Sequence, residues 1–266
     1  MAVRTVKRNA LEYLVADGLS VPHGFTTRLG GVSTGHAAWL NLGMNRDPQP
    51  ENVVKNYHIL AQALGFSPEK LVLTRQTHSD IVRKVTSRDA RGVDHHAYPE
   101  CDGLITDEPG TALCVFTADC TPILLWDPVT GAVGAAHAGW RGTVSKIAAK
   151  TAQQMADAYG CRREDLRAAI GPNIGFCCFE TDGDVPEAIR QAYGEAAEPY
   201  IRKKGEKFYL DLKAINELAL REAGISKIDI SDACTACQSQ RFWSHRVTRG
   251  LRGSQGAIIV CKEVQR

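Results

Sequence analysis

The sequence predicts an α+β fold, in which mixed sheets are flanked by helices. Short apolar runs typical of buried strands, such as "PILLW" and "AVGAA", occur together with segments whose apolar residues follow helical spacing. These strands and helices do not alternate in the regular rhythm of a doubly wound parallel sheet. Apolar residues make up 44% of the 266 residues, which is enough to fill a sizeable core. We therefore expect one domain that spans residues 1–266.

Each predicted element has its own local signal. Residues 21–42 are rich in Gly, Thr, Ser and Asn, which predicts a long irregular loop after a short strand. Helical spacing predicts helices at residues 51–65, 143–159 and 211–224, closed by Gly65, Gly160 and Gly224. Further strands are predicted at residues 71–74, in "LRAAIGPNIG" and in the final "GAIIVCKE".

The charge balance argues against several classes of partner. The net charge is +2, and no dense run of Lys and Arg occurs, so neither nucleic acid nor a membrane surface is an expected partner. The N-terminal residues lack the apolar stretch of a signal peptide, and no run of about 18 apolar residues exists. Nine cysteines are an odd number, and several lie in apolar settings. We expect a soluble cytoplasmic protein with mostly reduced thiols.

A thiol and an imidazole occur at the same end of the predicted hairpin that joins "PILLW" to "AVGAA". If "DPVT" forms the turn, Asp127 faces Thr130, and the same register places Cys120 opposite His137 with both side chains on one face. Gly131 could form a bulged turn, and a slip of one residue would place the two side chains on opposite faces.

These two residues permit two kinds of chemistry. A neutral imidazole can take the proton of a thiol and leave a nucleophilic thiolate. Alternatively, the thiolate of Cys120 and the imidazole of His137 are two ligands for a metal, and His78, at the end of another predicted strand in "LTRQTHSDIV", supplies a third. A His/Cys/His set suits zinc or copper. A buried cysteine beside a capping histidine, with no chemistry, is the alternative.

The remaining cysteines and histidines have weaker signals. Cys234 and Cys237 form a lone CxxC, for which we expect a structural role that catalysis does not require. Cys177 and Cys178 are adjacent, so we expect their side chains to point in different directions and not to chelate one ion easily. His95 and His96 lie in a predicted exposed loop, whereas the histidine of "FWSHR", residue 245, could line a pocket.

Two arginines are candidates for holding an anion. Arg28 lies beside the glycine-rich "GGVSTG", which does not match a P-loop but could present backbone N–H groups. Arg141 lies in "GWRG", just before a helix that we expect to begin near Thr143 as its N-cap. Because guanidinium groups bind phosphate in bidentate fashion, Arg141 is the expected phosphate ligand.

Taken in order, the motifs resemble one known family. "HGFTTRLGGVS", "RQTHSD", "DGLITDEPG", "TADCTPILLWDP", "AAHAGWRGT", "AAIGPNIGFCCFE" and "FWSHR" are similar to the YfiH or laccase-domain family, some members of which were called polyphenol oxidases. The resemblance runs from about residue 23 to residue 260. Two departures, "QTHS" for the commoner "QVHG" and "SHR" for "SYR", affect expected substrate preference more than the metal site.

The resemblance implies a fold, a metal site and a set of activities. The fold is a layered α/β/β/α arrangement of mixed sheets, similar to the cysteine-hydrolase-like CNF-toxin domain. The implied metal ligands are His78, Cys120 and His137, with zinc as the usual metal and copper as the alternative. The implied activities are phosphorolysis of adenosine, inosine, guanosine and methylthioadenosine, together with adenosine deamination. Some relatives are linked to peptidoglycan editing.

The leading hypothesis is therefore a zinc-dependent purine nucleoside enzyme whose substrates are nucleosides and phosphate. In its deamination, Asp119 could move protons to the departing ammonia. An alternative is a hydrolase acting on a cell-wall precursor, with Cys120 as nucleophile and His137 as base. A copper-dependent phenol oxidase is a third hypothesis, but multicopper chemistry needs more ligands than one His/Cys/His set, and the chain has no His-x-His pair.

Overall fold

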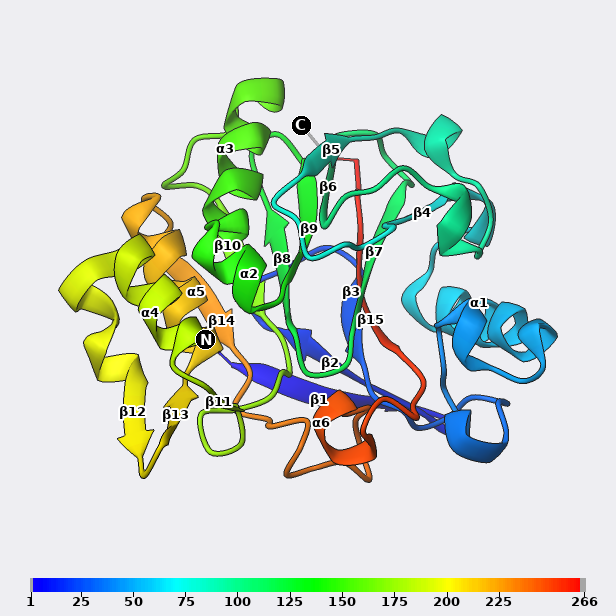
Figure 1. The fold of residues 1–266 in the computed structure, drawn as a ribbon. Helices are drawn as coiled ribbons and strands as arrows, with labels where there is room; N and C mark the ends of the chain where they lie inside the picture. The colour runs from blue at the N-terminus through cyan, green and yellow to red at the C-terminus, as the bar shows by residue number, and fades with distance from the viewer. Residues whose placement is uncertain (1, 264–266) are drawn as a thin grey trace.

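The computed structural model describes residues 2–263, which form two six-stranded sheets and a third, three-stranded sheet (Figure 1). The first sheet contains, in order, β1 (Val3–Arg8), β2 (Leu11–Ala16), β3 (His23–Thr26), β15 (Gln255–Val260), β7 (Ala112–Thr117) and β4 (Leu71–Leu73). The second contains β14 (Lys227–Ile230), β10 (Arg167–Ile170), β8 (Thr121–Trp126), β9 (Val133–Ala138), β6 (Gly103–Thr106) and β5 (Val82–Lys84). The third contains β11 (Glu180–Thr181), β13 (Lys207–Leu210) and β12 (Ile201–Lys204).

The first two sheets are mixed, which confirms the α+β expectation. In the first sheet β4 runs parallel to β7, whereas β15 runs antiparallel to both β3 and β7. In the second sheet β10 pairs parallel with β14 and antiparallel with β8. The strand β15, which comes last in the sequence of the described strands, thus lies inside the first sheet between β3 and β7, which come much earlier in the sequence.

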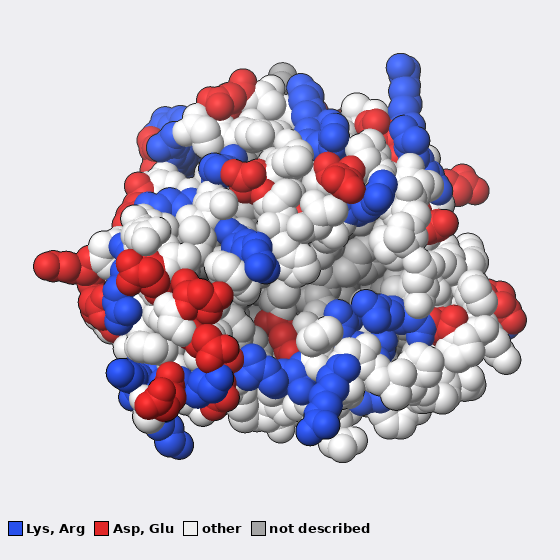
Figure 2. Space-filling view, in the orientation of Figure 1, with Lys and Arg blue, Asp and Glu red and all other residues white. Residues whose placement is uncertain are grey.

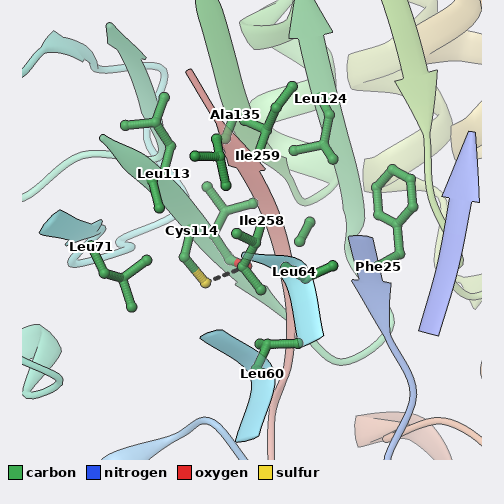
Figure 3. Close-up of a cluster of buried hydrophobic side chains, with 14 of the residues drawn as sticks. Phe25, Leu60, Leu64, Leu71, Leu113, Cys114, Leu124, Ala135, Ile258 and Ile259 are labelled. Atoms are coloured by element: carbon green, nitrogen blue, oxygen red, sulfur yellow. Dashed lines mark hydrogen bonds between the residues drawn. The ribbon is translucent and has the colours of Figure 1, made fainter. Parts of the chain in front are cut away.

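The main core fills the space between these two sheets. Leu113 and Ile259 of the first sheet pack in one buried cluster with Leu124 and Ala135 of the second (Figure 3). Alternate residues of β8 point to the other face, where Ile123 belongs to a second cluster. Because side chains alternate along a strand, a strand buried on both faces reads as a continuous apolar run, which is the pattern of "PILLW".

Helices cover the outer faces of the two sheets. The helix α1 (Pro50–Leu64) packs Leu64 beside Gly24 and Tyr13 on the first sheet. The helix α3 (Ile147–Tyr159) places Ile147 and Met155 in the second cluster, against the second sheet. The sequence of layers is therefore helix, sheet, sheet, helix.

Two predicted helices are found close to their expected bounds. The helix α1 ends at Gly65, which adopts φ 75° as a left-handed C-cap. The helix α5 (Leu212–Glu222) begins after Asp211, whose side chain accepts a hydrogen bond from the backbone N–H of Ala214 at 3.2 Å.

The prediction of one helix at residues 143–159 is wrong. The structure has two helices, α2 (Trp140–Val144) and α3, separated at Lys146, which adopts a left-handed φ of 56°. Gly139, and not Thr143, is the N-cap of α2. Thr143 is buried inside α2, where its hydroxyl accepts a hydrogen bond from Nδ2 of Asn216 at 2.9 Å. Its polar side chain therefore serves packing between helices and not a helix terminus.

Several elements had no clear sequence signal. They are the helices α4 (Asp184–Tyr193) and α6 (His245–Thr248), the three-stranded sheet, and short 3₁₀ segments at Gly35–Ala37, Met44–Arg46, Pro68–Lys70, Ser87–Asp89, His95–Ala97 and Gly194–Tyr200. Within residues 2–263, no helix is both long and apolar enough to cross a membrane.

Candidate functional site

The hairpin of β8 and β9 brings Cys120 and His137 to one end of the second sheet. Thr121 pairs with Ala138 and Pro122 with His137, so the predicted register is wrong by two residues. The turn is longer than "DPVT", since the N–H of Asp127 donates to the carbonyl of Ala132 and Gly131 adopts φ 81°. An offset of two residues preserves the face of each side chain, so the two groups still meet, diagonally.

His78 completes a three-residue group that we call the mixed site, formed by His78, Cys120 and His137. The candidate ligand atoms of these residues all lie within 4.8 Å of one another. The Nε2 atom of His78 lies 3.9 Å from Sγ of Cys120, and the two imidazole rings meet edge to face with centroids 5.1 Å apart. His78 is exposed, Cys120 half-buried and His137 buried, so the group lies at the boundary of core and solvent.

The backbone around the mixed site is shaped to let these side chains approach. His78 lies in the loop after β4, not at the strand end, and adopts φ 59°. Asp119, next to Cys120, adopts φ 89°. Positive φ is uncommon outside glycine, and such residues persist where surrounding contacts hold them. A β-carbon at Gly139 would lie 2.7 Å from Cδ2 of His78 and 3.3 Å from Sγ of Cys120, so glycine is required there.

Asp102, which the sequence analysis did not single out, organises the mixed site from behind. Its Oδ1 atom lies 2.8 Å from Nδ1 of His137, and neither side chain is more than 4% exposed. The same carboxylate accepts backbone N–H bonds from Thr77, His78 and Ser79 at 2.7–3.2 Å, and a bond from the hydroxyl of Ser79 at 2.7 Å. One carboxylate therefore fixes both the orientation of His137 and the loop that carries His78. The only sequence signal was an aspartate immediately before a buried strand.

The electrostatics of the group favour a thiolate. Burial would raise the pKa of Asp102, but its bonds to His137 and Ser79 lower that pKa to about 2. Burial would also raise the pKa of Cys120, yet the adjacent His137 and His78 lower it to about 6. Burial disfavours the charged form of His137. The nearby Cys120 and Asp102 have the larger effect, so they raise the pKa of this imidazole to about 9. The carboxylate and the thiolate thus stabilise a proton on the ring between them.

The mixed site opens into a cavity of about 410 Å³. Its lining includes His78, Cys120 and Gly139, the apolar side chains Trp140, Ile174, Phe179 and Leu212, and His245, which the sequence had marked as a pocket candidate. Four arginines also line it: Arg46, Arg141, Arg246 and Arg252. Basic side chains border the hollow between α2 and α6 in the space-filling view (Figure 2). The cavity therefore combines apolar walls with positive charge.

The predicted anion and substrate residues have different placements. Arg141 lines the cavity, with its guanidinium 4.2 Å from the ring centre of Trp140. Asp119 also lines the cavity, but its Oδ1 accepts from the hydroxyl of Thr235 at 2.6 Å and its Oδ2 from the backbone N–H of Arg246 at 2.7 Å. Asp119 is thus a bracing residue whose oxygens are both engaged.

Arg28, the other predicted anion ligand, lies outside the lining of this cavity. Its guanidinium stacks 3.9 Å from the ring centre of Trp243 and donates to the carbonyl of Ser239 at 3.1 Å. The lining arginines that the sequence analysis did not single out are Arg46, Arg246 and Arg252, and two of them, Arg246 and Arg252, lie at the end of the "FWSHR" motif and shortly after it.

The thiols of the adjacent Cys177 and Cys178 lie close together, whereas we expected side chains that point in different directions and do not easily chelate one ion. Sulfur atoms of Cys177, Cys178, Cys234 and Cys237, which we call the four-cysteine cluster, all lie within 4.8 Å of one another. Residues 176–178 form a turn and not an extended strand, so the alternation of side chains that underlies the expectation does not apply.

The residues of the mixed site fit a metal ion by their own chemistry. Two imidazole nitrogens and one thiolate are the ligand types that zinc prefers, and three protein ligands leave one position open. The Nδ1 atom of His137 is engaged by Asp102, which leaves Nε2 free to bind. A carboxylate hydrogen-bonded to a ligating histidine is a recurrent feature of zinc sites.

Comparison with known proteins agrees with this fold. The family model described as multi-copper polyphenol oxidoreductase laccase matches residues 22–262. The purine nucleoside phosphorylase YlmD of Bacillus subtilis is 36% identical over 245 residues, covering 90% of this chain and 88% of the relative. A purine nucleoside phosphorylase of Deinococcus radiodurans is 39% identical over 250 residues, covering 94% and 92%. The crystal structure of the hypothetical protein YfiH from Bacillus licheniformis superposes with a TM-score of 0.92 at 34% identity, covering 98% and 99%.

The fold and the mixed site define an α+β protein with a His/Cys group that could hold a metal ion beside an arginine-lined cavity. The chain belongs to the YfiH or laccase-domain family, as its motifs predict. Its curated relatives in this family carry the name purine nucleoside phosphorylase.

Proposed function

We propose that the protein is a zinc-dependent purine nucleoside phosphorylase acting on adenosine, inosine, guanosine or methylthioadenosine. The observation that carries this proposal is the mixed site opening into a cavity that is apolar on one part of its wall and rich in arginine on another. An apolar wall suits a purine ring, and guanidinium groups suit phosphate. The names of the relatives support the same substrate class.

In phosphorolysis, an oxygen of phosphate forms a bond to C1′ of the ribose while the bond from C1′ to the purine nitrogen breaks. The purine leaves with the electron pair of that bond and takes up a proton. Arg252 is the strongest candidate for holding the phosphate, because its Nε is buried with no hydrogen-bond partner among residues 2–263. Arg141 and Arg46 add positive charge to the same cavity. Trp140 and Phe179 supply flat faces against which the purine packs.

The mixed site contributes orientation and a place for a metal. A zinc ion bound by His78, Cys120 and His137 would supply a Lewis acid, which stabilises negative charge on oxygen and lowers the pKa of water. Asp102 holds the Nδ1 proton of His137 and so fixes the tautomer that leaves Nε2 free to bind a metal ion. Asp102 also ties down the backbone on both sides of His78, which keeps that ring in register with Cys120.

Deamination of adenosine is the secondary activity within this proposal. Zinc deaminases use a carboxylate as general acid and base. Asp119 is the one carboxylate of the cavity lining that the structure describes, and both of its oxygens already accept hydrogen bonds. We therefore expect deamination to be slower than phosphorolysis.

A product assay on a panel of purine nucleosides tests the proposal. The purified protein is incubated with each nucleoside, with and without phosphate, and the products are separated by chromatography. Free base and ribose 1-phosphate that form only with phosphate support phosphorolysis. Free base formed equally well without phosphate, or no free base from any nucleoside, would contradict it, and inosine from adenosine reports deamination.

A second candidate function is supported by one feature of the site. Cys120, His137 and Asp102 are arranged as a nucleophile, a base and an orienting acid, so the same atoms suit a cysteine hydrolase acting on a cell-wall precursor. Iodoacetamide labelling and metal analysis on one sample separate the two functions. A zinc-loaded protein whose Cys120 resists alkylation until zinc is chelated supports the phosphorylase. A metal-free protein that is active and is inactivated by alkylation at Cys120 supports the hydrolase.

A further inference from the structure

The four-cysteine cluster has no role in the proposed reaction, yet its geometry is specific. Sγ of Cys237 lies 3.5 Å from Sγ of Cys177 and 3.4 Å from Sγ of Cys178, and all four sulfur atoms lie within 4.8 Å of one another. Zinc–sulfur bonds of about 2.3 Å in a tetrahedron place neighbouring sulfur atoms about 3.8 Å apart. The observed distances between the sulfur atoms lie around this value of about 3.8 Å, and small rotations of the exposed side chains of Cys177 and Cys237 would bring them to that distance.

The backbone, and not chance contact, brings the two cysteine pairs together. Asn173 forms a parallel bridge with Cys234, and the N–H of Thr235 donates to the carbonyl of Asn173 at 2.9 Å. Gly175 lies between the pairs, where an added β-carbon would be 3.2 Å from Cβ of Cys234 and 3.4 Å from Sγ of both Cys177 and Cys234. A side chain at residue 175 would therefore push the two segments apart.

We propose that Cys177, Cys178, Cys234 and Cys237 bind a zinc ion in a tetrahedral four-thiolate site, separate from the mixed site. Four thiolates with no open position are typical of a structural zinc site and not of a catalytic one. The spacing of Cys234 and Cys237 matches the short CxxC turn that supplies one pair of ligands in such sites. In reducing surroundings, where thiols persist, this ligand set favours zinc over a disulfide.

Hydrogen bonds prepare one sulfur atom for binding. Sγ of Cys234 accepts from the backbone N–H of Gly175 at 3.2 Å and from that of Cys237 at 3.5 Å. Hydrogen bonds to the charged form of a group favour that form, so these two N–H groups stabilise the thiolate that a metal ion requires.

The ion would hold one wall of the cavity in place. Ile174, one residue from Gly175, lines the cavity and donates its N–H to the carbonyl of Asp119 at 2.9 Å. Thr235, between the two cysteines of the CxxC, donates to the carboxylate of Asp119 at 2.6 Å. Both cysteine segments thus contact the residue beside Cys120. A tie between the segments stabilises this wall without supplying any group to the reaction.

Metal content of matched variants tests this site directly. We expect about two zinc ions per chain in protein purified under reducing conditions, measured by inductively coupled plasma mass spectrometry. Cys237→Ser should lower the content by about one ion, and His78→Ala should lower it by about one ion at the other site. Cys161→Ala, which removes a buried thiol outside both groups, is the control and should keep both ions. Unchanged zinc in Cys237→Ser, or a wild-type content of about one ion that only His78→Ala removes, would overturn the proposal.

A spectroscopic measurement keeps the test decisive if Cys237→Ser does not fold. Cobalt replaces zinc in the folded His78→Ala variant, and a tetrahedral four-thiolate site gives intense sulfur-to-cobalt charge-transfer bands. Absence of these bands would refute the site. Mass spectrometry of the same protein under non-reducing conditions adds a second criterion, since a disulfide in place of bound metal would also refute it. Neither measurement depends on the proposed nucleoside activity.

Discussion

The mixed site and the four-cysteine cluster differ in ligand chemistry and in their relation to the cavity. The mixed site combines two imidazoles with one thiol, lies on the cavity floor and is supported by the buried carboxylate of Asp102. The four-cysteine cluster contains only sulfur, lies behind the cavity wall and is supported by backbone N–H groups. An open position and a polar support suit chemistry, whereas a closed shell of thiolates suits a structural tie. The same chain thus separates two uses of cysteine by what surrounds each sulfur atom.

The largest expected effect breaks the mixed site alone. Cys120→Ser replaces a soft ligand by a weakly binding hydroxyl, so we expect the rate of phosphorolysis to fall by more than about 100-fold, beyond the loss typical of supporting residues. Phosphate-dependent release of free base, together with zinc content, measures the effect. Cys161→Ala should retain full activity, and an active Cys120→Ser enzyme would show that the thiol is dispensable.

Removing the support of the mixed site should have an intermediate effect. Asp102→Asn places an amide NH₂ among donors that now point at carboxylate oxygens, so we expect about 10–100-fold weaker zinc binding. The free energy of unfolding should also fall by about 1–3 kcal/mol, since a buried donor loses its acceptor. Competition with a chelator and denaturant titration measure the two quantities.

A second buried aspartate controls for loss of stability. Asp127 accepts bonds from the N–H of Val129 and the hydroxyl of Thr130 in the β8–β9 turn, remote from any metal ligand. Asp127→Asn should leave zinc affinity unchanged. If both variants lost zinc to the same degree, Asp102 would have only a general role in folding.

A smaller effect should separate the anion side of the cavity from its metal side. Arg252→Lys and Arg141→Lys keep the charge but lose the planar fork, so each should raise the apparent KM for phosphate by about tenfold, or about 1.4 kcal/mol. Deamination of adenosine, which uses no phosphate, should change much less. Arg28→Lys lies outside the cavity and should leave the KM for phosphate unaltered. Equal losses of both reactions would assign these arginines to folding or to the nucleoside.

The smallest expected effect concerns the four-cysteine cluster. Gly175→Ala introduces a β-carbon 3.2 Å from Cβ of Cys234, which strains the contact between the two cysteine segments. We expect the unfolding temperature to fall by about 2–4 °C, with kcat unchanged. Gly183→Ala is the matched control, since its added β-carbon would meet only Phe208 at 3.9 Å. A loss of kcat in Gly175→Ala without loss of stability would place the cluster in catalysis.

Local sequence signals predicted part of this arrangement. The apolar runs next to Cys120 and His137 predicted that both residues lie at the same end of a sheet. The predicted register was wrong by two residues, and a shift by an even number leaves each side chain on the same face. The glycine caps located the ends of the helices well, as at Gly65. Thr143 had the chemistry of an N-cap, but its burial against Asn216 overrode that preference.

Other features depend on contacts that no local pattern records. Asp102 is recognised only once β6 pairs with β9, because that pairing places its carboxylate behind His137. The four-cysteine cluster requires the bridge between Asn173 and Cys234, which joins distant parts of the chain. The rule that adjacent side chains point in opposite directions holds for an extended strand. It does not apply to Cys177 and Cys178, because residues 176–178 form a turn that places both thiols in the same cluster.

The position of β15 has a consequence for the order of synthesis. This strand lies between β3 and β7, so the first sheet stays divided until residues 255–260 have left the ribosome. At about 5–20 residues per second, β3 waits on the order of tens of seconds for its neighbour. Until then the nascent chain exposes unpaired strand edges on both sides of the gap, which makes it a natural client for chaperones. A ribosome that stalls before residue 255 would therefore hold a chain in which the residues of the mixed site and of the cavity lining are present but the first sheet cannot close.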